Sequence, residues 1–276
     1  MTAPDVVVHH PATRPGAPGT DAVSVVLLHG GNVASWMWEP QVEALDDLDV
    51  WTPDLLGFGS RGDQVPATLD AVVDDVAATV SAIPAGREVH VVGLSLGGIV
   101  ALRLAAQHPG LVRSVLASGA VVDGVPGLAG AFGRAQLRVW DRPWYWRGQA
   151  VAMGIPADAR DLFVRSGLAI RRETMARLLP DVYGGRWPDG LAESGARVLA
   201  VAGGRDLRPA RRALATIQRR VPDAVVRLAP GMHHQWSAED PDLFSAMIRS
   251  WAVDGVAPPA LVPLAPARQR RKPAEK

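Results

Sequence analysis

Short, valine-rich apolar runs alternate along this chain with segments of helical periodicity, and this alternation most strongly constrains the fold. Short apolar runs rich in β-branched residues are typical of parallel strands buried on both faces. The alternation predicts a parallel sheet with helices on both faces, which is the α/β class. The expected strands lie at residues 6–8, 23–28, 50–53, 89–92, 112–117, 198–202 and 225–228, and the expected helices at residues 36–45, 69–83, 97–108, 209–221 and 241–251.

The alternation is interrupted between Gly119 and Arg197, where no strand pattern occurs. An unstructured loop of this length is implausible inside a compact domain. Helical patterns at residues 128–139, 157–168 and 171–179 instead indicate a helical insertion on the sheet. The predicted organisation is a core domain of residues 1–120 and 197–256, a helical cap of residues 121–196, and a disordered, proline-rich tail of residues 257–276.

The composition narrows the classes of function. The 276 residues are 48% hydrophobic and 21% charged, which is ordinary for a globular protein with a sizeable core. The formal net charge of +1 gives no sign of binding to nucleic acid or to an anionic membrane. No apolar run approaches the ~20 residues of a membrane span, and no signal peptide is recognisable. We therefore expect a cytoplasmic monomer or homodimer that acts on a small molecule.

The strongest chemical signal is the segment Gly93-Leu94-Ser95-Leu96-Gly97, which lies between a predicted strand and a predicted helix. Its G-x-S-x-G pattern permits a tight strand-to-helix turn that projects the Ser95 hydroxyl outward. A serine at the N-terminus of a helix also lies where the helix dipole favours developing negative charge. The pattern predicts a nucleophilic serine, with a glycine-rich turn around an ordinary serine as the alternative.

With this turn, the chain resembles the α/β-hydrolase fold superfamily of serine hydrolases over about residues 23–251. The resemblance implies an α/β-hydrolase fold, with a mostly parallel sheet, helices on both faces and a helical cap. Four further segments carry it in the order of that family: the loop at His29, the turn that begins at Asp54, the strand that ends near Asp206, and the loop that contains His234.

The resemblance implies an oxyanion hole formed by two backbone N–H groups. The first belongs to Gly31, with Asn32 as the less favoured neighbour, and the second belongs to Leu96, directly after the nucleophile. Fixed donors of this kind are worth ~3 kcal/mol each in the transition state. His29 and Asp54 are expected to shape their loops without a catalytic role.

The resemblance also implies a catalytic triad of Ser95, His234 and Asp206. A histidine base needs a carboxylate at its other nitrogen, which holds the tautomer and stabilises the imidazolium. Asp123 is an alternative acid, because some relatives carry the acid after the preceding core strand. The adjacent His233 leaves a second candidate for the base, although the spacing within the loop favours His234.

Tryptophan is unusually frequent, with nine residues against four phenylalanines and two tyrosines. Trp140, Trp144 and Trp146 lie in the insertion, where they either line an apolar pocket or anchor the cap to the core. Trp36 and Trp236 follow the loops of the oxyanion hole and of the base. The candidate substrate-binding residues are therefore Asn32, Trp36, Trp140, Trp144 and Trp236.

Taken with the resemblance, these residues predict a metal-free serine hydrolase that cleaves a carboxylic ester of a small hydrophobic substrate through an acyl-enzyme. The chain carries no metal-binding motif, P-loop or dinucleotide fingerprint and no cysteine, so neither a metal nor a cofactor is expected. Lactone, thioester, amide and C–C bond hydrolysis use the same triad and remain open. The alternatives are a non-hydrolytic enzyme that needs no cofactor (a perhydrolase, lyase or biosynthetic cyclase) and a catalytically silent binding protein.

Overall fold

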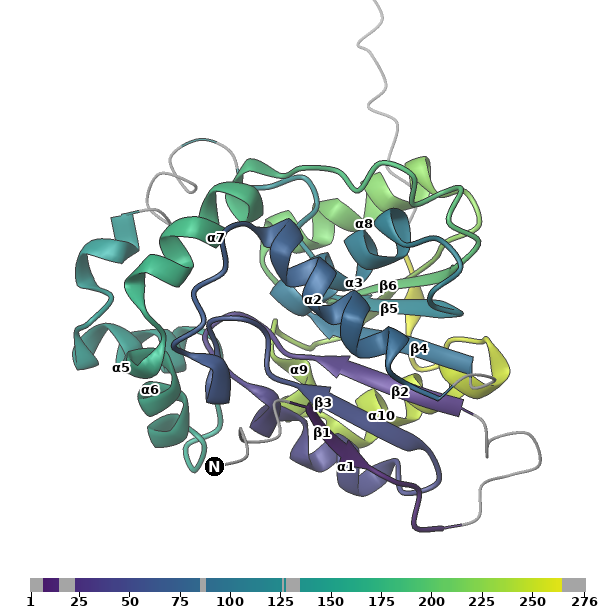
Figure 1. Cartoon of the computed structure of the whole chain (residues 1–276), viewed down its shortest axis with the longest axis horizontal. Helices are drawn as coiled ribbons and strands as arrows, with labels where there is room; N and C mark the ends of the chain where they lie inside the picture. Colours follow the sequence, from purple (N-terminus) through teal and green to yellow (C-terminus); the bar gives the residue numbers. More distant parts are fainter. Residues whose placement is uncertain (1–6, 15–22, 85–87, 126, 128–134, 265–276) are drawn as a thin grey trace, which may run out of the picture.

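A single sheet organises the protein, whose computed structural model describes residues 7–14, 23–84, 88–125, 127 and 135–264 (Figure 1). The eight strands lie in the order β1-β3-β2-β4-β5-β6-β7-β8. The edge strands β1 and β8 pair antiparallel with their neighbours, and the other pairs are parallel. The strands are β1 (Val7–His10), β2 (Val23–Leu28), β3 (Asp49–Pro53), β4 (Glu88–Leu94), β5 (Ser114–Ser118), β6 (Arg197–Gly203), β7 (Val225–Ala229) and β8 (Val262–Pro263).

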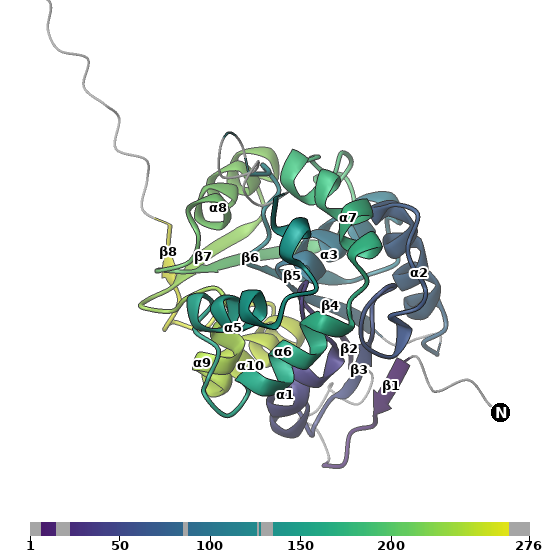
Figure 2. The same ribbon diagram turned by 90° about the vertical axis from the view of Figure 1, so that its left-hand side faces the viewer.

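Helices cover both faces of this sheet, as the alternation predicts (Figures 1 and 2). One face carries α2 (Leu69–Ser81), α3 (Leu96–Gln107) and α8 (Arg208–Arg220). The other carries α1 (Glu39–Ala44), α9 (Trp236–Glu239) and α10 (Pro241–Arg249), with short helical turns at Ser35–Trp38 and Ser250–Asp254. A further turn lies at Gly59–Arg61. The structure thus confirms the predicted α/β class.

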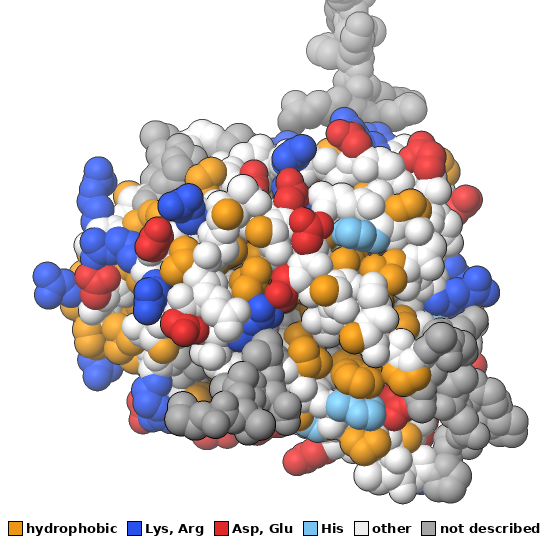
Figure 3. All heavy atoms as spheres, in the orientation of Figure 1, with side chains coloured by type: hydrophobic (Ala, Val, Ile, Leu, Met, Phe, Trp, Pro, Cys, Tyr) orange, Lys and Arg blue, Asp and Glu red, His pale blue; other side chains and the backbone are white. Residues whose placement is uncertain are grey.

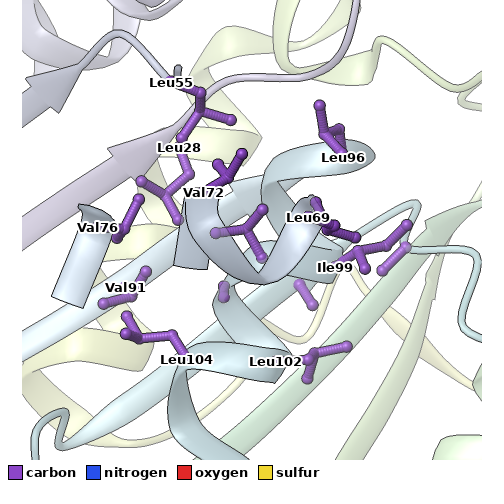
Figure 4. Packing of buried hydrophobic residues seen from close by; sticks show 14 of the residues in the cluster. Leu28, Leu55, Leu69, Val72, Val76, Val91, Leu96, Ile99, Leu102 and Leu104 are labelled. Carbon is purple, nitrogen blue, oxygen red and sulfur yellow. The ribbon is translucent and has the colours of Figure 1, made fainter. Parts of the chain in front are cut away.

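The buried core consists of two hydrophobic clusters, one on each face of the sheet. Between the sheet and helices α2 and α3, Val72, Val76 and Leu104 pack over Val91 of the central strand β4 (Figure 4). Val72 and Val76 are one helical turn apart on α2, and this spacing places both on the face that the sheet covers. The central strand and its flanking helices therefore give a rigid base to the turn at Ser95.

The described chain between β5 and β6 includes residues 135–184, which we call the cap, and the division into a core domain and a cap of residues 121–196 stays a prediction. The cap contains a turn at Gln136–Val139 and helices α5 (Pro143–Ala152), α6 (Arg160–Ala169) and α7 (Arg172–Gly184). It lies beyond the carboxyl ends of the parallel strands (Figure 1). The sequence did not predict α5, and most of the helix expected at residues 128–139 lies outside the described residues.

The two ends of the cap region cross at close range. The Val125 amide donates a hydrogen bond to the Tyr183 carbonyl at 2.9 Å. A Cβ on Gly185 would lie 2.2 Å from the carbonyl carbon of Asp123, and one on Gly124 would lie 2.5 Å from the Tyr183 oxygen. Both glycines have positive φ, so neither position accepts a larger residue without a shift of the backbone.

The prediction that the disordered tail begins at residue 257 is wrong. Residues 257–264 belong to the fold, because β8 pairs with β7 and Leu261 is buried. Residues 265–276, which were also expected to be disordered, lie outside the described residues. Within the described ranges, no helix combines the length and the apolarity that crossing a bilayer requires.

Candidate active site

Ser95 lies at a sharp turn between β4 and α3, with φ 54° and ψ −110°. This left-handed backbone is unfavourable for a residue with a side chain and persists only where the surroundings enforce it. Close backbone contacts enforce it here. A Cβ on Gly93 would lie 2.2 Å from the carbonyl group of Gly97, and one on Gly97 would lie 2.2 Å from the Leu28 oxygen. The two glycines of the G-x-S-x-G pattern are therefore required by the turn itself.

A buried histidine–aspartate pair lies at the carboxyl ends of neighbouring strands. His234 follows β7 and Asp206 follows β6, and His234 Nδ1 is 2.7 Å from Asp206 Oδ1. Both residues are more than nine-tenths buried. Asp206 Oδ1 also accepts the Leu207 N–H at 2.6 Å, which fixes the carboxylate. A carboxylate at Nδ1 orients the imidazole so that Nε2 is the nitrogen available to a substrate or a nucleophile.

Gly119 provides the space for this pair, a role that the sequence analysis missed. Its φ is +64°, and a Cβ there would lie 2.9 Å from His234 Cε1 and 3.4 Å from Asp206 Oδ2. The preceding residue, Ser118, accepts the backbone N–H of Ser95 at 2.7 Å. The turn at 118–119 is thus in contact with both Ser95 and His234. A glycine directly after a buried strand was the available signal.

The structure brings Asp206 and His234 together against Gly119, and it holds Ser95, on its own turn between β4 and α3, against the neighbouring Ser118. The Ser95 hydroxyl makes no hydrogen bond to any described residue, so this structure contains no Ser95–His234 hydrogen bond. In unliganded enzymes such contacts are often long and tighten only when substrate binds.

The two alternative triad residues have other partners. Asp123 accepts a hydrogen bond from the Thr216 hydroxyl at 2.7 Å, which links the segment that leads into the cap to α8. The His233 side chain is about half exposed, and its Nδ1 lies 3.0 Å from Glu239 Oε2. Neither side chain makes a hydrogen bond to His234 or Asp206, so the geometry favours Asp206 and His234 over the alternatives.

The proposed oxyanion donors lie on segments that pack against each other. A Cβ on Gly31 would be 3.9 Å from the Leu96 side chain, and one on Gly30 would be 3.7 Å from Ser95 Cβ. Leu96 is the first residue of α3, and the first N–H groups of a helix have no partner within the helix. Asn32 has φ 75° and a buried amide oxygen without a hydrogen-bond partner among the described residues.

His29 and Asp54 shape the loops around this site, in agreement with the sequence analysis. His29 is fully buried, with Nδ1 2.8 Å from the Gly30 oxygen and Nε2 accepting the Leu55 N–H at 3.0 Å. Burial lowers the pKa of His29, which keeps the imidazole neutral. Asp54 accepts the N–H groups of Ser35 and Ser60. No cluster of three or more metal-ligating side chains occurs within the described ranges.

The expected tryptophan pocket walls need correction. Trp140 and Trp236 are completely buried, and their indole N–H groups donate to the Ile170 carbonyl at 2.8 Å and to the Ser118 hydroxyl at 2.9 Å. Trp140 thus belongs to the interior of the cap and Trp236 to the core beside β5. Trp36 donates to the Ser166 hydroxyl and links the core to α6.

A cavity of about 790 Å³ lies between the cap and the start of α8. Two of its lining residues, Leu207 and Pro209, follow Asp206, and Val121 follows the turn at 118–119. Its walls are largely apolar. Trp144 lines the cavity and is 63% exposed, so it is the predicted substrate-binding tryptophan that the structure places at this opening. On the face in Figure 3, basic side chains surround hydrophobic ones at the left-hand end, where the cap lies.

Comparisons with known proteins agree with this architecture. The model of the alpha/beta hydrolase family matches residues 25–247. The chain belongs to the alpha/beta hydrolase family. An AB hydrolase superfamily protein of Gibberella zeae is 29% identical over 246 residues, which cover 83% of this chain and 80% of that protein.

Two further similarities are narrower. A putative carbamate hydrolase RutD of Agrobacterium fabrum is 35% identical over 100 residues, about a third of this chain and 38% of its own length. The solved structure of an esterase from Exiguobacterium antarcticum aligns with a TM-score of 0.76 at 17% identity, over 89% of this chain and 94% of that one. At this identity the structural likeness shows the shared fold.

Proposed function

We propose that this member of the alpha/beta hydrolase family is a serine hydrolase that cleaves carboxylic esters of small hydrophobic substrates. The observation that carries the proposal is the buried His234–Asp206 pair, with its 2.7 Å contact, next to the turn that holds Ser95 in an unfavourable backbone conformation. A surrounding structure that enforces such a backbone at a serine favours a reactive role for that serine.

In the first half-reaction, Ser95 Oγ attacks the acyl carbon while His234 Nε2 takes the hydroxyl proton. Asp206 stabilises the imidazolium that forms, through the contact at Nδ1. The N–H groups of Gly31 and Leu96 hold the oxyanion of the tetrahedral intermediate. Fixed donors at this position stabilise the transition state more than the ground state.

The intermediate then collapses to an acyl-enzyme. His234 gives its proton to the leaving alcohol, so the C–O bond of the ester breaks as the acyl bond to Ser95 remains. In the second half-reaction, a water molecule gives a proton to His234 and attacks the acyl carbon. Collapse of the second intermediate returns the proton to Ser95 and releases the carboxylic acid.

The apolar cavity supports a hydrophobic substrate group. Its lining residue Leu207 directly follows Asp206 in the sequence, and its volume of about 790 Å³ lies within the ~300–1,000 Å³ typical of small-molecule sites. Its apolar walls favour an alkyl or aryl group over a strongly hydrated one.

The test is labelling with a fluorophosphonate probe together with turnover of acyl esters of graded length. We expect Ser95→Ala to abolish labelling and to reduce turnover by about 10³-fold or more, with unchanged thermal unfolding. Labelling of the wild type without turnover of any ester would favour the non-hydrolytic alternative. Absence of both would favour a binding protein.

The adjacent histidines provide a matched control within one loop. His234→Ala should lose turnover as Ser95→Ala does, because the base is removed. His233→Ala should retain most of the activity, since its imidazole contacts Glu239 and not Asp206. Steady-state kinetics from about pH 5 to pH 9 compare the two variants across the range in which histidine titrates. An inactive His233→Ala with an active His234→Ala would show that His233 is the base and that the proposed assignment is wrong.

A further inference from the structure

The polar side chains in the cavity include a hydrogen-bonded chain of three residues from three parts of the cap. Tyr145 on α5 and Tyr183 on α7 flank Gln136, which lies in the turn at Gln136–Val139. All three line the cavity, whose other lining residues are mostly apolar. Buried donors and acceptors without partners are unfavourable, so such a wall favours a ligand that forms the missing hydrogen bond.

The directions of the two hydrogen bonds among these three side chains leave one donor without a partner. The Tyr145 hydroxyl donates to Gln136 Oε1, and Gln136 Nε2 donates to the Tyr183 hydroxyl oxygen at 3.2 Å. The Tyr183 hydroxyl thus acts as an acceptor, and its own proton has no acceptor among the described residues. Burial raises the pKa of both phenols, so each keeps its proton at neutral pH.

Tyr183 is also fixed by its backbone. Its carbonyl accepts the Val125 N–H at 2.9 Å, at the crossing where Gly124 comes close to the same oxygen. Val125 itself lines the cavity. The phenol therefore belongs to a cavity wall whose backbone is held in place, as preorganised recognition requires.

We propose that this cavity selects esters whose apolar chain carries an oxygen acceptor, such as a ketone, at a distance from the scissile bond, and that the Tyr183 hydroxyl donates to that oxygen. The inference rests on the proposed function, because it assigns the cavity to a part of the ester. A plain hydrocarbon chain leaves the Tyr183 donor unpaired after its solvent is displaced, whereas a chain with an acceptor pairs it.

Two p-nitrophenyl esters of equal chain length test this, one a plain alkanoate and the other with a ketone near the far end of the acyl chain. We expect the wild type to prefer the keto ester by about fivefold to tenfold in kcat/KM, the effect of one neutral hydrogen bond. Tyr183→Phe should remove the preference between the two esters, because the ring is kept and only the hydroxyl is lost.

Tyr145→Phe is the matched control, since it removes the phenol that already donates to Gln136 and should keep most of the preference. A preference lost in Tyr145→Phe and kept in Tyr183→Phe would overturn the assignment. Arg138, an exposed cation that also lines the cavity, allows a further comparison with a carboxylate-ended ester. If the enzyme favours that ester over the keto ester and Arg138→Gln abolishes the preference, the cavity selects substrates by their negative charge and the proposal fails.

A binding measurement separates this inference from the proposed function. Calorimetric titration of the Ser95→Ala protein with a medium-chain methyl ketone needs no turnover. Binding that weakens about fivefold to tenfold in the Ser95→Ala/Tyr183→Phe protein supports the cavity assignment even if no ester is hydrolysed. Ester turnover by the wild type without any dependence on Tyr183, in kinetics or in binding, would refute the inference and leave the proposed function standing.

Discussion

The turn at Ser95 and the cap are held in place by different kinds of contact. At the turn, backbone lies directly against backbone, as the 2.2 Å positions of a Cβ on Gly93 or Gly97 show. In the cap, large rings fill the interior, with Trp146 packed on Phe163 and against the glycine at 167. The first kind of contact excludes every side chain at a position. The second needs apolar volume and one hydrogen-bond acceptor for each indole, so it tolerates more sequences except where a ring lies against backbone, as Trp146 does at Gly167.

Glycine substitutions in the two regions should give the largest contrast. Gly93→Ala drives a methyl group into the Gly97 backbone and should destabilise the protein by at least about 3 kcal/mol, with loss of ester turnover. Gly148→Ala, in the middle of α5 with no atom within 4 Å of the added carbon, should stabilise the protein by about 0.5–1 kcal/mol.

Urea unfolding followed by circular dichroism gives both free energies of unfolding. Equal effects at the two positions would mean that the turn can adjust and that the proposed difference between the regions is wrong.

Tryptophan substitutions sharpen the contrast within the cap. Trp146→Ala removes a fully buried ring whose N–H donates to the Trp140 carbonyl at 2.7 Å, so a cost of about 3–5 kcal/mol is expected. Trp144→Ala removes an exposed ring and should change stability by about 0.5 kcal/mol or less. Because Trp144 lines the cavity, its loss should instead alter the preference among ester chain lengths. Thermal unfolding measures the stability of both variants, and kcat/KM over a series of ester chain lengths measures the preference. A stability loss in both variants with no change in preference would mean that both rings anchor the cap to the core.

The smallest expected effect is a pH dependence in the core domain. Arg249 of α10 donates hydrogen bonds to both carboxylate oxygens of Asp47, and this contact holds the pKa of Asp47 below its ordinary value. A lowered carboxyl pKa adds stability above the pKa of the unfolded state, and this stability is lost as pH falls through the folded-state pKa.

Asp47→Asn should therefore be less stable than the wild type at pH 7, and the difference should shrink below about pH 4. Arg249 is partly exposed, so solvent screening keeps the effect small. Urea unfolding of both proteins at the two pH values measures it; a gap that stays constant would mean that the pair does not titrate with folding.

The sequence predicted the elements whose residues are constrained locally. The strands with continuous valine-rich runs, such as 23–28, agree with the structure because burial on both faces leaves no other pattern. The turn at Ser95 was predictable for the same reason, since its glycines are required by contacts within a few residues or with the neighbouring strand.

The remaining elements depend on contacts that a sequence does not display. Helix α5 lacks helical periodicity because Trp144 and Val151 are exposed on one side while Tyr145, Trp146 and Ala150 are buried on the other. Because α5 carries apolar residues on both its exposed and its buried side, its sequence shows no amphipathic pattern. Strand β8 lies in a proline-rich stretch and forms because β7 offers a free edge and Leu261 finds a buried site.

The same limit applies to the site. Spacing in the final loop favoured His234 over His233, but the direction of each side chain is set by the partners Asp206 and Glu239. Trp236 follows the proposed base in sequence, yet its ring turns inward to Ser118. The space that Gly119 leaves for the imidazole is visible only when strands β5, β6 and β7 are side by side.

The crossing of residues 123–125 with residues 183–185 has a consequence for how such chains diversify. Strands β5 and β6 are hydrogen-bonded neighbours, so the sheet is continuous beneath the cap and does not depend on it for its order. In the described part of the chain, the segments that lead into and out of the cap cross at Gly124 and Gly185, next to the hydrogen bond from the Val125 amide to the Tyr183 carbonyl. An insertion with adjacent ends can be lengthened, shortened or exchanged at little entropic cost to the rest of the chain. Such a chain can therefore acquire a new substrate range by recombination at this crossing, while the residues around Ser95, Asp206 and His234 are inherited unchanged.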